Sequence, residues 1–244
     1  VVMFFLSVMA IREYVACFEK TTYKPIRSIL YISTLAMLSL VLIEGINFSG
    51  IGIAFLVYCF VVLLAVVVVL KNSKYNLISL AVTLFGVMQI PFLFSFVTLT
   101  RLLQNGVYYI WIIFIGACAT DTCAYFVGIL FGKNKLLPSV SPNKTIEGAV
   151  GGIIGTVVIM SLYGNYLVSK NIIDVSLVHF AVLGFVTSVV AQVGDLFASS
   201  IKRFVGVKDY GSILPGHGGI LDRFDSIMFI EPMIYFYIRL VGGV

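Results

Sequence analysis

The residues best suited to chemistry lie in one stretch, 194–225, of a chain that is otherwise mostly apolar. The stretch holds four acids, four bases and a histidine: Asp195, Asp209, Asp222, Asp225, Lys202, Arg203, Lys208, Arg223 and His217. Such charge beside membrane-length apolar runs is costly unless the charges are paired or serve a function. The stretch therefore predicts a site for a charged ligand.

Helical spacing gathers the carboxylates of this stretch on two helix faces. Asp195 shares a face with Ser199 and Lys202, at i, i+4 and i+7, and Asp222 shares one with Asp225, at i and i+3. Two helix ends that present carboxylates can hold a divalent cation, and Mg²⁺ prefers such hard oxygen ligands. We expect Mg²⁺ bound by Asp195, Asp222 and Asp225, with a second cation left open. Local ion pairs, such as Asp195 with Lys202, are the structural alternative.

A glycine-rich loop, LPGHGG at 214–219, lies between these two helices. Its glycines allow the backbone to approach a ligand and to turn N–H groups toward it. A helix follows directly, and its N-terminus favours an anion. The loop therefore predicts a phosphate contact, with His217 donating a hydrogen bond or transferring a proton. A flexible turn with an exposed histidine is the alternative.

A second cluster precedes this stretch, around residues 121–147. Asp121 lies inside an apolar run, which makes it a functional candidate by default. Ser141 followed by Pro142 predicts a helix start, with the serine as N-cap. Lys144 and Glu147 would then lie one turn apart at the membrane surface, although a snorkelling lysine at an ordinary helix start is the alternative. Glycines at 148, 151, 152 and 155 favour close helix packing.

The elements that must position these residues are membrane helices. The chain has 244 residues, of which 60% are hydrophobic and only 11% are charged, whereas soluble domains carry about 25% charged residues. A bilayer core requires about 20 apolar residues as helix. Eight segments qualify, at roughly 1–18, 28–43, 51–70, 76–100, 107–131, 146–168, 176–199 and 221–241. We expect an all-α integral membrane protein, a polytopic bundle of about eight transmembrane helices.

The distribution of basic residues predicts the orientation of this bundle. Thirteen of the sixteen bases lie in, or beside, the loops after the first, third, fifth and seventh segments. The opposite side holds only Arg101, Lys170 and Arg239. By the positive-inside rule the thirteen bases face the cytoplasm. This places Val1 on the outer side, so we expect a ninth, N-terminal helix to be missing from this chain.

The chain shows no internal repeat and no soluble segment with a core of its own. We therefore expect a single membrane domain over 1–244. Within it, 1–105 would form a scaffold with an oligomer-forming or lipid-facing surface, and 106–244 the catalytic part. Pro91 in the fourth segment predicts a kink.

Two blocks of residues resemble the signatures of phosphatidate cytidylyltransferases, also called CDP-diacylglycerol synthases. One block consists of SIKR at 200–203, KD at 208–209 and LPGHGGILDRFD at 214–225; the other consists of DTCAY at 121–125 and SPNKTIEG at 141–148. The match is specific over 121–226 and departs mildly, with Asn143 where a base is common and Ala198 where an acid is common. Before residue 121 only the hydropathy agrees with the family.

The resemblance implies an enzyme, a nucleotidyltransferase of phospholipid biosynthesis that transfers CMP from CTP to phosphatidic acid. The products are CDP-diacylglycerol and pyrophosphate, and no covalent intermediate is expected. The partners would be CTP, phosphatidic acid and membrane lipids, without nucleic acid, and a homodimer is left open. The enzyme would lie in a bacterial inner (plasma) membrane, with its site open to the cytoplasm and to the inner leaflet.

The resemblance also implies roles for individual residues. The catalytic set is expected to be Asp195, Asp222, Asp225, Lys202, Arg203 and His217. Contacts to the substrates are expected from Asp121, Ser141, Lys144, Glu147, Lys208, Asp209, Gly216, Gly218, Gly219 and Arg223.

Three other functions are alternatives to this interpretation. A CTP-dependent lipid kinase would transfer the γ-phosphoryl group and release CDP, and a related cytidylyltransferase would use another lipid phosphate. An ion-coupled transporter would also carry intramembrane acids. Transporters tend to show repeats and interrupted helices in matching halves. The crowding of polar residues into the C-terminal half of this chain argues against a transporter.

Overall fold

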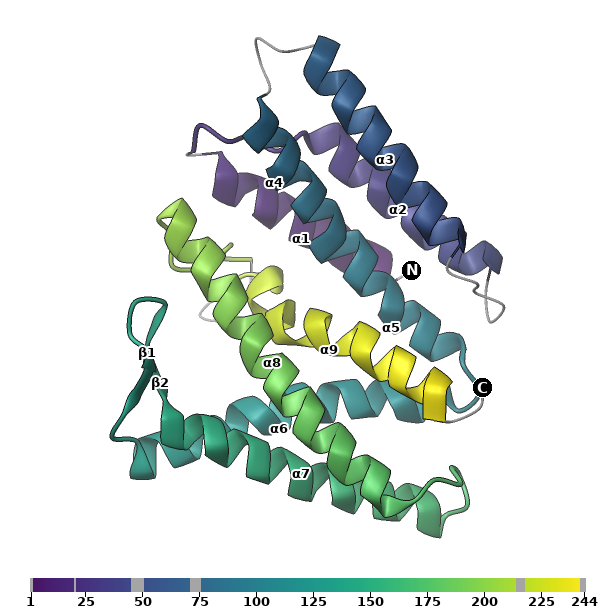
Figure 1. Ribbon diagram of the computed structural model, residues 1–244, viewed down its shortest axis with the longest axis vertical. Coiled ribbons are helices and arrows are strands. Elements are labelled where there is room, and N and C mark those ends of the chain that lie inside the picture. The colour runs from purple at the N-terminus through teal and green to yellow at the C-terminus, as the bar shows by residue number, and fades with distance from the viewer. Residues whose placement is uncertain (1, 20, 45–50, 71–75, 214–217, 242–244) are drawn as a thin grey trace. The chain divides into compact units, whose positions relative to one another are not determined.

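The fold is almost entirely helical, as the sequence predicts. The computed structural model describes residues 2–19, 21–44, 51–70, 76–213 and 218–241. The eight apolar segments correspond to α1 (Val2–Phe18), α2 (Arg27–Glu44), α3 (Ile51–Leu70), α4 (Leu77–Val87) continued by η2 (Met88–Phe92) and α5 (Leu93–Leu102), α6 (Gly106–Phe131), α7 (Ile146–Ser169), α8 (Leu177–Val205) and α9 (Ile220–Val241) (Figure 1).

Four of the described helical stretches are long and apolar enough to cross a membrane. They are Leu77–Leu102, Gly106–Phe131, Ile146–Ser169 and Leu177–Val205. Their lengths match the roughly 20 residues that a bilayer core requires. The chain is therefore an integral membrane protein.

The fourth predicted segment contains a π-helical turn, Met88–Phe92, around Pro91. Proline has no N–H group and its ring clashes with the preceding turn, so an α-helix cannot pass through it unchanged. In membrane helices such π adjustments restore hydrogen bonds that the proline disrupts. The helix is therefore irregular at Pro91, and the kink expected there stays a prediction.

The described chain forms two compact units. The first unit comprises Val1–Leu102 with Phe204–Phe224, and the second comprises Leu103–Arg203 with Asp225–Val244. The expected division of one membrane domain into a scaffold part, 1–105, and a catalytic part, 106–244, stays a prediction. However, residues 204–213 and 218–224, which were expected in the catalytic part, belong to the first unit.

Buried polar contacts tie the helices of the first unit together. The hydroxyl of Tyr14 donates to the carbonyl of Val82 at 2.8 Å, which joins α1 to α4. The hydroxyl of Thr83 accepts the N–H of Ile26 at 2.8 Å, just before α2. Gly86 lets α4 approach closely, because a Cβ there would lie 2.8 Å from the ring of Tyr14.

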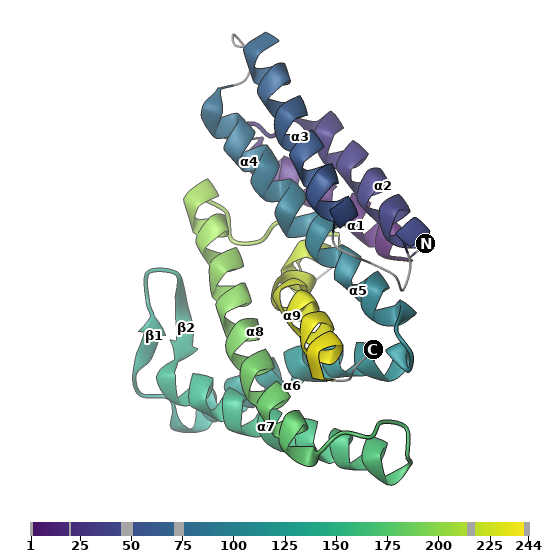
Figure 2. The ribbon, with the colours of Figure 1, turned by 45° about the vertical axis from the view of Figure 1, so that its right-hand side comes forward.

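In the second unit, α6 and α7 lie side by side (Figures 1 and 2). The glycines of α7 make this close approach possible. A Cβ on Gly151 would lie 2.5 Å from the side chain of Val127, and one on Gly155 would lie 2.3 Å from the Sγ of Cys123. The packing role predicted for these glycines is confirmed.

A short β-hairpin joins α6 to α7 at one end of this pair (Figure 1). Its strands, β1 (Lys135–Leu137) and β2 (Ser141–Thr145), pair antiparallel. The prediction that Ser141 and Pro142 begin the helix is wrong. Thr145 is the N-cap of α7, and its hydroxyl accepts the N–H of Gly148 at 3.1 Å.

Contacts across the hairpin explain this later helix start. The carboxylate of Glu147 accepts the backbone N–H groups of Lys133, at 3.1 Å, and Asn134, at 3.2 Å. These bonds hold the start of the hairpin against the first turn of α7. Lys144 therefore lies in an extended strand rather than one helical turn from Glu147, which corrects that expectation.

Candidate active site

A cavity of about 470 Å³ lies at the hairpin end of the second unit. It is lined by α6, the hairpin, α7 and α8, through Asp121, Ala124, Tyr125, Gly128, Ile129, Leu136, Asn143, Lys144, Thr145, Gly148, Ala149, Gln192 and Asp195. Three of the predicted site residues, Asp121, Lys144 and Asp195, thus meet in one recess although they come from separate segments.

An ion pair crosses this cavity. The Nζ of Lys144 donates to the Oδ2 of Asp195, and the two side chains keep 29% and 25% of their exposure. A local pair of Asp195 with Lys202 is the alternative from the sequence, whereas in the structure Asp195 pairs with a lysine 51 positions away. Because both groups remain partly exposed, an incoming anion can compete for the ammonium group of Lys144, and an incoming cation can compete for the carboxylate of Asp195.

Gln192 is a cavity residue that the sequence analysis did not identify. It lies three residues before Asp195 on α8, and its Nε2 donates to the carbonyl of Ala149 at 3.1 Å and to the Oγ of Ser188 at 3.3 Å. The bond to Ala149 connects α8 to α7 beside Asp195, whereas Ser188 lies on α8 itself. A polar amide at i−3 from an acid, inside an apolar helix, was the available signal.

A second acid, Asp225, lies near Asp195 in the same unit. Gly194 allows this approach, because a Cβ there would lie 3.1 Å from the carbonyl of Asp225 and 2.9 Å from the ring of Phe229. Asp225 is buried, and the charges of Asp195, Lys202 and Asp121 act on it. Three of the predicted acids therefore share one electrostatic environment.

Asp222 belongs to the first unit and lies in the first turn of α9. Its Oδ2 accepts the N–H of Tyr210 at 2.8 Å and the N–H of Gly219 at 3.0 Å. Gly218 has a φ of +79°, a left-handed conformation that favours glycine, and it lies against the same carboxylate. Lys208 and Asp209 lie in this segment and Arg223 follows Asp222, while Gly216 and His217 fall outside the described residues.

Comparison with known sequences identifies the family of this chain. The sequence model of the Cytidylyltransferase family matches residues 1–241. The chain belongs to this family. The resemblance found in the signature blocks is thereby confirmed.

Three relatives of this cytidylyltransferase-family chain illustrate the similarity. A phosphatidate cytidylyltransferase of Bacillus subtilis (strain 168) is 43% identical over 145 residues, which cover 59% of this chain and 52% of that protein. Those of Staphylococcus saprophyticus and Staphylococcus aureus (strain COL) are each 40% identical over 168 residues, covering 68% of this chain and 62% of the relative. The match thus spans between half and two thirds of these relatives.

Two other residues of the family's signature blocks support the hairpin. The carboxylate of Glu147 holds backbone N–H groups, as described above, and the Nε of Arg203 donates to the carbonyl of Val140 at 3.2 Å. Among the described residues, the cavity lining includes Lys144 but neither Ser141 nor Glu147. These contacts indicate that Glu147 and Arg203 shape the wall that carries Lys144.

The acids of this cytidylyltransferase-family chain are of the ligand type that Mg²⁺ prefers. Within the described ranges, no three His, Cys, Asp or Glu side chains are arranged to hold a metal ion by themselves. Mg²⁺ usually takes one or two carboxylates and completes its shell with water and substrate phosphates. Asp195 and Asp225 lie in one unit, where the charge of Asp195 acts on Asp225, and each could supply one such carboxylate. The metal site therefore stays a prediction.

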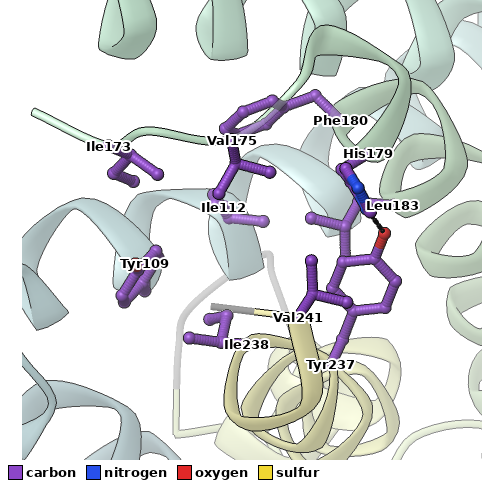
Figure 3. Close-up of a pocket in the computed structure, with 10 residues that line it drawn as sticks. All are labelled: Tyr109, Ile112, Ile173, Val175, His179, Phe180, Leu183, Tyr237, Ile238 and Val241. Atoms are coloured by element: carbon purple, nitrogen blue, oxygen red, sulfur yellow. Dashed lines mark hydrogen bonds between the residues drawn. The ribbon is translucent and has the colours of Figure 1, made fainter. Parts of the chain in front are cut away.

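A smaller cavity of about 30 Å³ lies elsewhere in the second unit (Figure 3). Its lining is mostly aliphatic and aromatic, including Ile112, Phe180 and Leu183. The Nδ1 of His179 and the hydroxyl of Tyr237 form a hydrogen bond of 2.7 Å there, which joins α8 to α9. This histidine is satisfied by a structural partner, and no acid is among the described residues that line the cavity.

Proposed function

We propose that this protein is a phosphatidate cytidylyltransferase, which forms CDP-diacylglycerol and pyrophosphate from CTP and phosphatidic acid. The cavity of the second unit is the observation that carries this proposal. It brings Asp121, Lys144 and Asp195 together between apolar helices, in a chain of the Cytidylyltransferase family. The similar proteins of Bacillus and Staphylococcus bear this name.

The reaction joins two anions, so neutralising and positioning them are the main requirements. A phosphate oxygen of phosphatidic acid attacks the α-phosphorus of CTP, and the bond from this phosphorus to the bridging oxygen of the β-phosphate breaks. Pyrophosphate carries that electron pair away. No protein nucleophile is needed, because the lipid phosphate is already ionised. Positioning and electrostatic stabilisation supply most of the catalysis in such phosphoryl chemistry.

Lys144 is the residue suited to clamp a phosphate in this cavity. Its ammonium group already contacts Asp195, so it is held at the cavity wall before substrate arrives. A phosphate carries more negative charge than one carboxylate and can draw the ammonium group to itself. Asp195 would then be released to a cation.

Mg²⁺ would be held by Asp195 and Asp225, with Asp222 a further ligand expected from the sequence. When bound, the ion would neutralise phosphate charge and favour departure of pyrophosphate. The chain's own contribution is to keep two acids close together, through the Gly194 contact between α8 and α9.

The apolar part of the cavity suits a lipid substrate. Tyr125 and Ile129 line the cavity and are 64% and 63% exposed, on a helix that is long and apolar enough to cross a membrane. Acyl chains could therefore stay in the bilayer while the phosphate reaches Lys144. CTP would enter from the aqueous side of the same recess.

The basic residues around the cavity support a cytoplasmic location for this end. Lys133, Lys135 and Lys144 lie at the hairpin, and the hydrogen bond from Arg203 to Val140 brings the C-terminal end of α8 to the same place. By the positive-inside rule, such a basic end faces the cytoplasm, where CTP is made.

The position of a radioactive phosphorus label in CTP tests the proposed reaction. Purified protein with Mg²⁺ and phosphatidic acid should transfer label from the α-phosphate of CTP into lipid and release label from the γ-phosphate as pyrophosphate. Transfer of γ-label into the lipid would establish the kinase alternative. Release of pyrophosphate at the same rate without phosphatidic acid, or no reaction with it, would also contradict the proposal.

A further inference from the structure

A buried acid in α1 reaches the start of α9. Glu13 is only 3% exposed. Its Oε1 accepts the N–H of Ile220 at 2.9 Å, and its Oε2 accepts the N–H of Leu221 at 2.8 Å. These N–H groups belong to the first turn of α9, which cannot bond them internally. The carboxylate thus acts as a cap supplied from a helix more than 200 residues earlier in the chain.

Two glycines make room for this carboxylate. A Cβ on Gly211 would lie 2.6 Å from the Oε1 of Glu13, and a Cβ on Gly219 would lie 2.5 Å from its Oε2. Any larger residue at either position would displace the acid or the backbone. Gly211 and Gly219 therefore pack directly against the carboxylate of Glu13.

The same backbone also holds Asp222. Gly219, which contacts Glu13, donates its N–H to the Oδ2 of Asp222 at 3.0 Å, and Tyr210, beside Gly211, donates to the same atom at 2.8 Å. Glu13 and Asp222 are thus linked through the backbone at 210–211 and at 219–221. A shift of the Glu13 carboxylate would move the groups that orient Asp222.

The charge of Glu13 suits this arrangement. Among the described residues, no salt bridge involves Glu13. Its negative charge instead lies at the positive end of the α9 dipole, where an acid is stabilised. Glutamine has nearly the same shape, but its amide nitrogen would face an N–H donor and it carries no charge.

We propose that Glu13 is a positioning residue that fixes the start of α9 and thereby the carboxylate of Asp222 for the reaction. This inference rests on the proposed function, in which Asp222 is a further ligand of the metal. Residues that orient a metal ligand typically contribute about 10- to 100-fold to metal affinity or activity. We expect a loss of this size when Glu13 is replaced.

The test compares Glu13→Gln with Glu19→Gln in the full chain. Glu19 directly follows α1, is exposed and pairs with Arg27, so it is a matched control. Glu13→Gln should raise the Mg²⁺ concentration for half-maximal activity, or lower turnover, by about 10- to 100-fold. It should also speed hydrogen exchange of the amides of Ile220 and Leu221, while exchange in the α6–α7 pair stays unchanged. Glu19→Gln should change none of these.

Two outcomes would overturn the inference. One is unchanged exchange at 220–221 in Glu13→Gln; the other is faster exchange there with an unchanged Mg²⁺ requirement and turnover. If Glu13→Gln does not fold, Gly211→Ala tests the same contact with the carboxylate retained. Wild-type exchange at 220–221, Mg²⁺ requirement and turnover in that variant would also reject the inference. A wild-type protein that forms no CDP-diacylglycerol would instead reject the proposed function, while the exchange measurement would still report on the contact.

Discussion

At the scale of single residues, the ion pair between Lys144 and Asp195 dominates the candidate site. Partly exposed ion pairs contribute about 0–1 kcal/mol to stability, because solvent screens them and ordering two side chains has an entropic cost. With about a quarter of each side chain exposed, this pair belongs to that class. Its location in the cavity is therefore better explained by ligand binding than by stability.

Replacing Lys144 with methionine separates these two explanations. Lys144→Met should lower turnover by about 100-fold or more, the usual effect of removing one group that stabilises transition-state charge. The free energy of unfolding, measured in detergent, should change by about 1 kcal/mol or less. Lys170→Met, at an exposed lysine after α7, is the control and should keep full activity. Normal turnover in Lys144→Met would remove this lysine from the phosphate clamp.

At the scale of elements, the α6–α7 pair determines the geometry of the cavity. Asp121 lies on α6, and Lys144 lies in the strand that leads into α7. Their separation depends on how closely the two helices pack. Small residues permit such close packing in membranes, where van der Waals contact is a main source of helix association.

A larger residue at Gly155, which is not among the residues that line the cavity, should disturb the packing of α6 against α7. Gly155→Val would bring a Cβ within 2.3 Å of the Sγ of Cys123, and overpacking of this kind costs about 1–3 kcal/mol. We expect a lower melting temperature and reduced turnover. Ile154→Val, at a 60% exposed neighbour on α7, should leave both unchanged. A fully stable and active Gly155→Val protein would show that the contact is not required.

At the scale of the whole molecule, the distribution of bases predicts one orientation in the membrane. The hairpin between α6 and α7 carries lysines, whereas the α7–α8 connection, residues 170–176, holds Lys170 and Asp174. Since α7 is long enough to cross a membrane, these two connections are expected on opposite sides. The hairpin would face the cytoplasm.

Single cysteines can report this orientation. In a chain whose four cysteines have been replaced, Ser139→Cys would mark the hairpin and Asp174→Cys the α7–α8 connection. A membrane-impermeant maleimide should label Asp174→Cys in intact cells, but Ser139→Cys only after the cells are permeabilised. Both sites are exposed, so a failure to label reflects the membrane barrier. The reverse pattern would place the cavity on the outer side.

Much of the helical architecture could be predicted because it depends on local composition. Each apolar segment expected from the sequence corresponds to a described helix or helical stretch, and most ends agree within a few residues. The start of α7 was missed because Ser141 and Pro142 have the local features of a helix cap. Only the contacts of Glu147 with the hairpin backbone show why Thr145 takes that role instead.

The sequence by itself determined the membrane helices, the family resemblance and the set of polar residues from which the candidate site is built. Apolar length and charge are local properties, read directly along the chain. Only the tertiary structure decided that Asp195 pairs with Lys144, that Gln192 lines the cavity and that Glu13 caps α9. The physical reason is that a charged group in an apolar protein must find a partner in space, and helix packing alone decides which distant residue is within reach.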